Sequence, residues 1–408
     1  MTLALPRVFQ VGVLSFCLLG APGALWAQQG NGWTGADLAQ LQTASDQGVP
    51  EAQYALAMRV EHGDGVLQNY ALAAEWLARA AKQGHSASAN RLGQYFHAGL
   101  GVEQNREAAI QWLEQAAETG EAQYLYDLAV VLEEGPEGVA DPARAAELYQ
   151  TAADLGLLDA MVSLGVLYQN GNGVEQDFSR AKALYEGPAE QGHARAQNNL
   201  GLLYVRGEGV PQDYARAFEL FDAAAAKGLK VAMGNLGVMY ENGFGVATDE
   251  KRAAELYRLA ARDGQEIDSD GGVPRAVFDP RLAAPDTSPD GMARLQNGVR
   301  AGDPLAMYTA GWLIMQDPEP GQEGLRQAAQ LFRASAQAGN PAAMANLGLM
   351  YFDGRAVPQD FALGYMWLVL AGTAGFTQAL DLSAVLASRM TPGQISEAQQ
   401  MAEARAGQ

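Results

Sequence analysis

Apolar residues recur along most of the chain at helical spacing, in paired stripes separated by a glycine-rich turn. In residues 193–228, Ala196, Leu200 and Tyr204 lie four apart and would line one face of a first helix. A second stripe follows the turn and consists of Ala217, Leu220, Phe221 and Ala224. The pattern predicts two amphipathic helices that pack together as one unit.

The residues between the two stripes specify how the helices end and begin. Gly207 and Gly209 can adopt the positive φ that stops a helix, and Asp213 suits the N-cap of the next one. The same cap position holds an asparagine or aspartate in other parts of the chain: Asn69, Asn105, Asp141, Asp177, Asp249 and Asp360. We therefore expect the same helix-turn-helix unit to be repeated.

Glycines mark the period of this repeat. They occur 36 residues apart at Gly48, Gly84, Gly120, Gly156, Gly192, Gly228 and Gly264, and the series continues after a break at Gly302, Gly339 and Gly375. This spacing predicts six contiguous repeats in residues 49–264 and two more in residues 303–375. The expected fold class is all-α, an α-solenoid of about eight repeats of 36 residues.

The remaining segments flank or interrupt the array. Residues 28–48 are expected to form a polar leader and an N-terminal capping helix, and residues 376–408 to form C-terminal capping helices, the last starting at Thr391. Residues 265–302 are an irregular insertion or an eroded repeat whose second helix survives from Met292 onward. A hinge between two separate solenoids is the alternative.

The N-terminus has the pattern of a secretory signal. Arg7 precedes an apolar run from Val8 to Leu19, and small residues lead to Ala27, after which we expect cleavage. The run is shorter than a membrane span, although an uncleaved anchor is the alternative. Residues 1–27 therefore predict export through a Sec-type route to the periplasm, with no membrane insertion after cleavage.

Composition excludes several classes of function. The chain has 27 Lys+Arg against 47 Asp+Glu, a net charge of −20, which disfavours binding to nucleic acid. Cys17 is the single cysteine and lies inside the signal, so the mature chain has no thiol chemistry. The four histidines show no metal-binding spacing, and no catalytic motif is present. We predict no catalytic residues, no metal, no cofactor and no enzymatic activity.

The chain closely resembles the Sel-1-like repeat (SLR) family of secreted bacterial type, a relative of the tetratricopeptide repeat. Residues 160–168 (AMVSLGVLY) and 171–174 (GNGV) fit its pattern of an A-x-x-x-L-G-x-x-Y helix and a G-x-G-V turn. The resemblance covers residues 49–264 and 303–375. It implies a right-handed superhelix whose concave face binds protein partners. Some cysteine-rich relatives act on β-lactams, an activity that the missing cysteines do not support here.

Five residues are candidates for contact with a partner. Asn199, Asn235 and Asn346 each precede the core leucine of a first helix, as Arg91 does in an earlier repeat. An amide there could hold a peptide backbone by donating to its C=O and accepting from its N–H. The alternative is that these asparagines bond the backbone of a neighbouring repeat and only lock the stack. Trp312 departs from the repeat pattern and could also face a partner or pack in the core.

The sequence therefore predicts an exported scaffold or regulator that binds a protein or peptide. Envelope signalling or cell-wall assembly are the settings that the resemblance suggests, with peptidoglycan-associated proteins among the candidate partners. A hydrolase of cell-wall or β-lactam substrates, built on the same solenoid, is the rival hypothesis.

Overall fold

The computed structural model describes residue 33 and residues 35–135, 139–261 and 274–407. The predicted signal at 1–27 and the residues 265–273 of the insertion lie outside this part of the chain. All elements within it are α-helices, so the all-α prediction is confirmed. None of these helices is both long enough and apolar enough to span a membrane.

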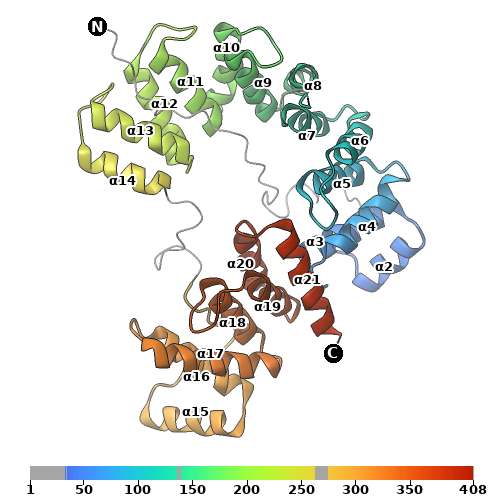
Figure 1. Ribbon diagram of the computed structural model, residues 1–408, viewed down its shortest axis with the longest axis vertical. Coiled ribbons are helices and arrows are strands. Elements are labelled where there is room, and N and C mark those ends of the chain that lie inside the picture. The colour runs from blue at the N-terminus through green and yellow to red at the C-terminus, as the bar shows by residue number, and fades with distance from the viewer. Residues whose placement is uncertain (1–32, 34, 136–138, 262–273, 408) are drawn as a thin grey trace. The chain divides into compact units, whose positions relative to one another are not determined.

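Eight first helices alternate with eight second helices (Figure 1). The first helices are α3 Pro50–His62, α5 Ser86–Ala98, α7 Ala122–Glu133, α9 Leu158–Asn170, α11 Ala194–Arg206, α13 Lys230–Asn242, α16 Pro304–Gln316 and α18 Pro341–Asp353. The second helices are α4 Tyr70–Ala81, α6 Arg106–Ala117, α8 Pro142–Asp154, α10 Phe178–Glu190, α12 Tyr214–Ala226, α14 Glu250–Ala261, α17 Gly321–Gln337 and α19 Phe361–Thr373.

Four further helices lie outside the eight pairs: α2 Leu38–Asp46, α15 Pro289–Ala301, α20 Gln378–Ala387 and α21 Pro392–Ala406. Helix α2 lies in residues 28–48, where a capping helix was expected, and α15 lies in residues 265–302, where a surviving second helix was expected. Helix α21 begins as predicted, with Thr391 as N-cap in a capping box with Gln394. The assignment of residues 265–302 as an insertion, an eroded repeat or a hinge stays a prediction.

The described chain divides into two compact units. One contains α6 to α14. The other combines α2 to α5 with α15 to α21, so it joins stretches that are far apart in the sequence. Within each unit consecutive helices pack side by side, as a solenoid requires (Figure 1).

In the second unit, polar side chains join the first repeat to the last repeat and to helix α21. The Tyr365 hydroxyl donates to the side-chain oxygen of Gln68 at 2.7 Å, and both residues are buried. The backbone N–H of Tyr70 donates to Gln399 of α21 at 3.0 Å. Asn69 also bonds Glu403. Because these groups are mostly shielded from water, their hydrogen bonds fix how the two stretches meet.

Six of the predicted N-caps are confirmed, and Asn105 stays a prediction. Asp213 accepts from the N–H of Arg216 at 2.9 Å, and Asp360 accepts from Leu363 at 2.9 Å. The same bond is made by Asn69, Asp141, Asp177 and Asp249. Sequence reasoning missed a second set of caps: His85 and His193 accept from the N–H of Ser88 and Ala196 and so cap first helices.

The second glycine of several turns is needed for space as well as for conformation: this holds for Gly101, Gly173, Gly209 and Gly245. Gly173 has φ of +71°, and a Cβ there would lie 2.3 Å from the carbonyl carbon of Pro142, at the start of the preceding second helix. Ala356 takes the equivalent place in the last repeat with φ of 57°. The repeat before it has a different connection, through Pro318 and Pro320, which is consistent with a side chain being tolerated there.

In several repeats a tyrosine of the second helix bonds the first helix of the same repeat, a contact that we call the tyrosine lock. Its ring covers a first-helix glycine, as Tyr185 covers Gly165, and its hydroxyl reaches the end of the first helix. Tyr185 donates to Gln169 at 2.9 Å. Tyr149 and Tyr257 make the same bond to Glu133 and Glu241. In the next repeat Val205 takes the place of Gln169 and Phe221 takes the place of Tyr185. A polar partner is thus paired with a hydroxyl and an apolar partner with a plain ring.

Helix α10 keeps its length although Pro188 lies inside it: α10 has 13 residues, as α12 does. The valines of the turns differ in burial. Val357 is buried, yet Val139 is 54% exposed, because the turn of its repeat has a different sequence, with proline and alanine around it.

Candidate partner-binding site

An extended stretch of chain lies against the first helices of the last two repeats. We call residues 274–282 the strap, and the surface of α16 and α18 that holds it the strap site. The strap has no helix or strand of its own. The N–H and C=O of Val277 and the N–H of Asp279 bond side chains of the two helices, which is how a bound peptide would be held.

Asn346 of α18 holds the backbone at the centre of the strap. Its side-chain oxygen accepts from the N–H of Val277 at 2.7 Å, and its amide nitrogen donates to the C=O of Val277 at 2.9 Å. The second amide hydrogen bonds Ala342 within α18 at 2.9 Å. Asn346 and Val277 are 1% and 2% exposed, so these hydrogen bonds are shielded from water.

Tyr308 of α16 completes this clamp. Its hydroxyl accepts from the N–H of Asp279 at 2.8 Å and donates to the C=O of Val277 at 3.2 Å. Burial raises the pKa of Tyr308 to about 12, so the hydroxyl keeps its proton at neutral pH and can do both. The N–H and C=O of Val277 and the N–H of Asp279 are therefore bound by two side chains, those of Asn346 and Tyr308.

Side chains of the strap add apolar contact. The ring of Phe278 lies 4.7 Å from that of Trp312 and 6.1 Å from that of Tyr308, measured between centroids. Trp312 is half-buried. Trp312 and Asn346 were both proposed from sequence as partner contacts, and the structure brings them to one site, where the chain's own strap lies between them.

Arginines hold the two ends of the strap. Arg275 donates to the C=O of Pro318 at 3.2 Å, while Arg355 of the last repeat donates to the C=O of Arg275 at 3.2 Å. At the other end Arg281 donates to the C=O of Gly375 at 2.9 Å, just after the C-terminus of α19, where the helix dipole favours a cation. Bonding to Arg281 also lowers the pKa of Asp279.

The other two asparagines lie inside the stack of the first unit. Asn199 and Asn235 are each 2% exposed. Asn235 donates to the side-chain oxygen of Asn198, in the preceding repeat, at 2.9 Å, and Asn198 donates to Asn199 at 3.2 Å. The alternative expected from sequence was a bond to the backbone of a neighbouring repeat; Asn235 does bond the preceding repeat, but through a side chain. Contact of these residues with a partner stays a prediction.

The same repeat positions make different contacts in the two units. Asn198 and Tyr308 each lie six residues after their repeat glycine, and Asn235 and Asn346 each lie seven residues after the next one. Asn198 bonds Asn235 directly. Tyr308 and Asn346 instead share the C=O of Val277. The strap is thus inserted where neighbouring repeats otherwise bond each other.

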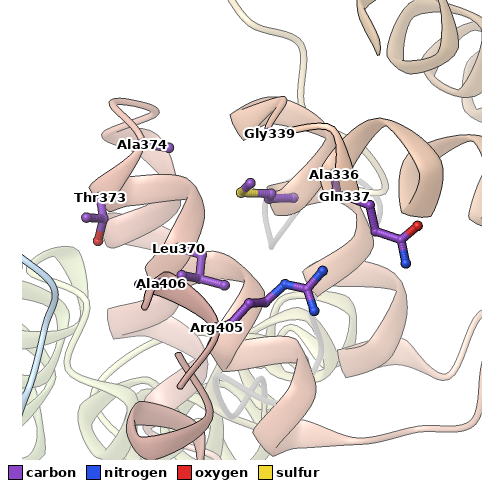
Figure 2. Close-up of a pocket in the computed structure, with 9 residues that line it drawn as sticks. Ala336, Gln337, Gly339, Leu370, Thr373, Ala374, Arg405 and Ala406 are labelled. Atoms are coloured by element: carbon purple, nitrogen blue, oxygen red, sulfur yellow. The ribbon is translucent and has the colours of Figure 1, made fainter. Parts of the chain in front are cut away.

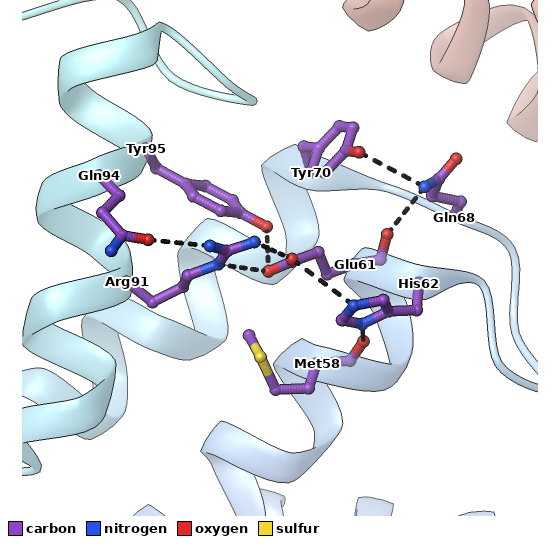
Figure 3. Close-up of polar contacts among 8 residues, drawn as sticks. All are labelled: Met58, Glu61, His62, Gln68, Tyr70, Arg91, Gln94 and Tyr95. Atoms are coloured by element: carbon purple, nitrogen blue, oxygen red, sulfur yellow. Dashed lines mark hydrogen bonds and ion pairs between the residues drawn. The ribbon is translucent and has the colours of Figure 1, made fainter. Parts of the chain in front are cut away.

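Arg91 lies in a buried network (Figure 3). Its guanidinium pairs with the carboxylate of Glu61, with Nε 2.9 Å from Oε2, and the hydroxyl of Tyr95 donates to that carboxylate at 2.7 Å. Gln94 accepts from Arg91 at 2.8 Å. Burial alone would raise the pKa of Glu61, but the charge and hydrogen bonds of Arg91 outweigh it and hold that pKa below its usual value.

A separate pocket of about 460 Å³ lies among α17, α18, α19 and α21 (Figure 2). Gln337, Leu370, Thr373 and Arg405 line it together with small apolar residues. The Arg405 guanidinium is also 4.4 Å from the ring centroid of Trp367. No strap residue lines this pocket. Among the described residues, no group of three or more His, Cys, Asp or Glu is arranged to hold a metal ion.

These features define the class of protein: a helical-repeat solenoid that holds extended chain on its first helices. The Sel1 repeat profile matches residues 50–85, 86–120, 122–157, 158–193, 194–229, 230–265 and 341–376, which is more than half of the chain. The chain therefore belongs to the Sel1 repeat family. The matched ranges omit residues 303–339, where the structure nevertheless has the predicted helix pair α16 and α17.

Two solved structures are similar to this chain. A Sel1 repeat protein from Oxalobacter formigenes is 28% identical with a TM-score of 0.53, over 59% of this chain and 98% of that one. A protective antigen of uropathogenic Escherichia coli with an SLR fold is 23% identical with a TM-score of 0.51, over 90% and 94%. The second similarity shows the fold alone. No curated protein matches the chain.

Proposed function

We propose that this protein is an exported scaffold that binds a protein or peptide partner on its first helices. Sel1 repeat proteins generally act as scaffolds for protein–protein interaction. Binding of a peptide is supported by the hydrogen bonds of Asn346 and Tyr308 to the backbone of Val277. A side-chain pair that binds backbone groups can hold an extended segment without depending on every side chain of that segment.

The proposed location is the periplasm, and the proposed setting is envelope signalling or cell-wall assembly. The location rests on the signal-like pattern in residues 1–27. The net charge of −20 favours partners with basic segments over nucleic acid. Fractionation of the cells that make the protein, with N-terminal sequencing of the mature chain, tests both export and cleavage after Ala27. A cytoplasmic protein that keeps Met1 would contradict export.

Photocrosslinking tests the binding function. A benzoylphenylalanine at position 312 should crosslink distinct proteins in envelope extracts. The matched control places it at position 326, on the exposed face of second helix α17, where Arg326 has a side chain that is 62% exposed. The same bands from both positions would contradict the proposal. So would the absence of a protein band from position 312 in a chain whose strap is weakened by Val277→Asp and Phe278→Ser.

The rival hydrolase is not proposed, because no observation in the described residues favours it. The prediction of no enzymatic activity is tested by incubating the mature chain with muropeptides and with the chromogenic β-lactam nitrocefin. Turnover that copurifies with the chain and is lost on substitution of one of its carboxylates would contradict a pure scaffold.

A further inference from the structure

The strap has the properties of a ligand. It contacts the first helices of two neighbouring repeats without forming a helix or strand, and the N–H and C=O of Val277 are bound by helix side chains. Its most buried side chain is that of Val277, and the next residue places an aromatic ring against Trp312. These are the features by which peptide-binding repeat surfaces recognise a segment of another chain.

The strap also lies between two repeat positions whose side chains bond each other directly in the first unit. In the first unit the corresponding side chains, Asn198 and Asn235, bond each other at 2.9 Å. Between Tyr308 and Asn346 the peptide group of Val277 takes that role. The site is therefore built to accept one backbone group from a segment outside the repeats, whichever chain supplies it.

The ends of the strap define the charge of a matching ligand. Arg275 and Arg281 reach backbone carbonyls of Pro318 and Gly375, and the C=O of Gly375 lies just past the C-terminal end of α19. Cations are favoured there by the helix dipole. A protein with a net charge of −20 adds a general attraction for basic segments.

From this geometry we propose that the strap site binds extended peptides in which an aliphatic residue is followed by an aromatic one, with an arginine on each side. Residues 274–282 are the built-in competitor that such a partner displaces. This inference rests on the proposed scaffold function and names its ligand class and its regulation. A tethered competitor acts at an effective concentration of about millimolar, so it weakens binding of a free peptide without new contacts.

The test uses the full mature chain and a synthetic peptide of residues 274–282, PRAVFDPRL, blocked at both ends. The receptor variant carries Val277→Asp and Phe278→Ser, which weaken the strap. Calorimetry should show that this variant binds the peptide at least about tenfold more tightly than the wild-type chain does. Adding Asn346→Ala to the variant should weaken binding by about tenfold or more. A peptide with the same Asp and Ser changes is the matched control and should not bind.

Equal affinity of the two chains would overturn the competitor role. Unchanged affinity after Asn346→Ala, or no binding by a variant that keeps its helical circular dichroism and melting transition, would overturn the site. A second experiment does not depend on the variants. The peptide with benzoylphenylalanine in place of its phenylalanine, added in excess to the wild-type chain, should crosslink to residues 304–316 or 341–353, and crosslinks elsewhere would contradict the site.

Failure of this inference can be told apart from failure of the proposed function. Envelope proteins captured at position 312 together with no binding of the peptide would show a scaffold whose ligands have another pattern. Peptide binding together with no captured protein would show a real site that does not serve a protein partner.

Discussion

The side-chain amide of Asn346 forms two hydrogen bonds with the backbone of Val277, one through each of its polar atoms. The two residues are separated by 69 positions in the sequence. Both are buried, so this contact contributes more than a solvent-exposed pair would. It is the structural basis for considering the first helices of this solenoid as a peptide-binding surface.

The buried asparagines of the first unit should behave differently from Asn346. Asn235→Ala leaves the side-chain oxygen of Asn198 without its bond from the next repeat, so we expect a loss of about 1–3 kcal/mol in the free energy of unfolding. Chemical denaturation measures it. A variant of unchanged stability that loses affinity for a captured partner would instead place Asn235 in the binding surface.

The tyrosine lock predicts a compensated double substitution. Tyr185→Phe leaves the buried oxygen of Gln169 without its donor, which should cost about 1–3 kcal/mol. The double variant Gln169→Val and Tyr185→Phe reproduces the Val205 and Phe221 pair of the next repeat. It should recover most of that loss. A double variant as unstable as Tyr185→Phe alone would show that ring and partner are not coupled.

The turn glycines allow a matched comparison. Gly173→Ala combines an unfavourable φ of +71° with a Cβ 2.3 Å from the carbonyl carbon of Pro142. Gly65 has φ of +70° and nothing within 4 Å of the same Cβ. Gly65→Ala should cost about 1–2 kcal/mol from conformation alone, and Gly173→Ala distinctly more. Equal losses in the two melting curves would mean that the close approach has little energetic weight.

The pair of Glu61 and Arg91 predicts a stability that depends on pH. Because the pKa of Glu61 is lowered in the folded chain, its contribution is complete above the usual value of 4.5 and is lost as the pH falls through the folded pKa. The free energy of unfolding should therefore differ most between wild type and Glu61→Gln above that value, and the difference should shrink on acidification.

The control for this experiment is Glu114→Gln. Glu114 pairs with Arg144, but the two side chains are 41% and 44% exposed, so its removal should change stability by less than about 1 kcal/mol at any pH. A difference for Glu61→Gln that stays constant as the pH falls would show that ionisation of Glu61 does not stabilise the fold.

The sequence predicted the repeats well because their signals are local. Caps such as Asp213 and the glycines that end each helix act within one turn of chain, so a single repeat contains all the information. The amide of Asn346 was expected to hold the backbone of a partner; it bonds the backbone of the chain's own Val277, and its contact with a partner stays a prediction. Its ligand could not be predicted, because residues 274–282 have no periodicity and their place depends on tertiary contacts.

Other site residues show the limit of repeat position as a guide. Asn199, Asn235 and Asn346 occupy the same position, yet only Asn346 meets the strap. The difference arises from the neighbouring position, where Asn198 can reach Asn235 but Tyr308 bonds the strap. Arg91 likewise pairs with Glu61 of the preceding repeat. The contacts of Asn235, Asn346 and Arg91 each involve a residue 30 or more positions away, which the pattern of one helix does not contain.

Hydrogen exchange of the strap amides tests the central claim most directly. If first-helix side chains bind extended backbone, the amides of Val277 and Asp279 in the wild-type chain should exchange far more slowly than in the free PRAVFDPRL peptide. Asn346→Ala should speed exchange of the Val277 amide by about tenfold or more while the amides of α16 and α18 stay protected. A Val277 amide that exchanges as fast in the wild-type chain as in the free peptide would contradict the claim.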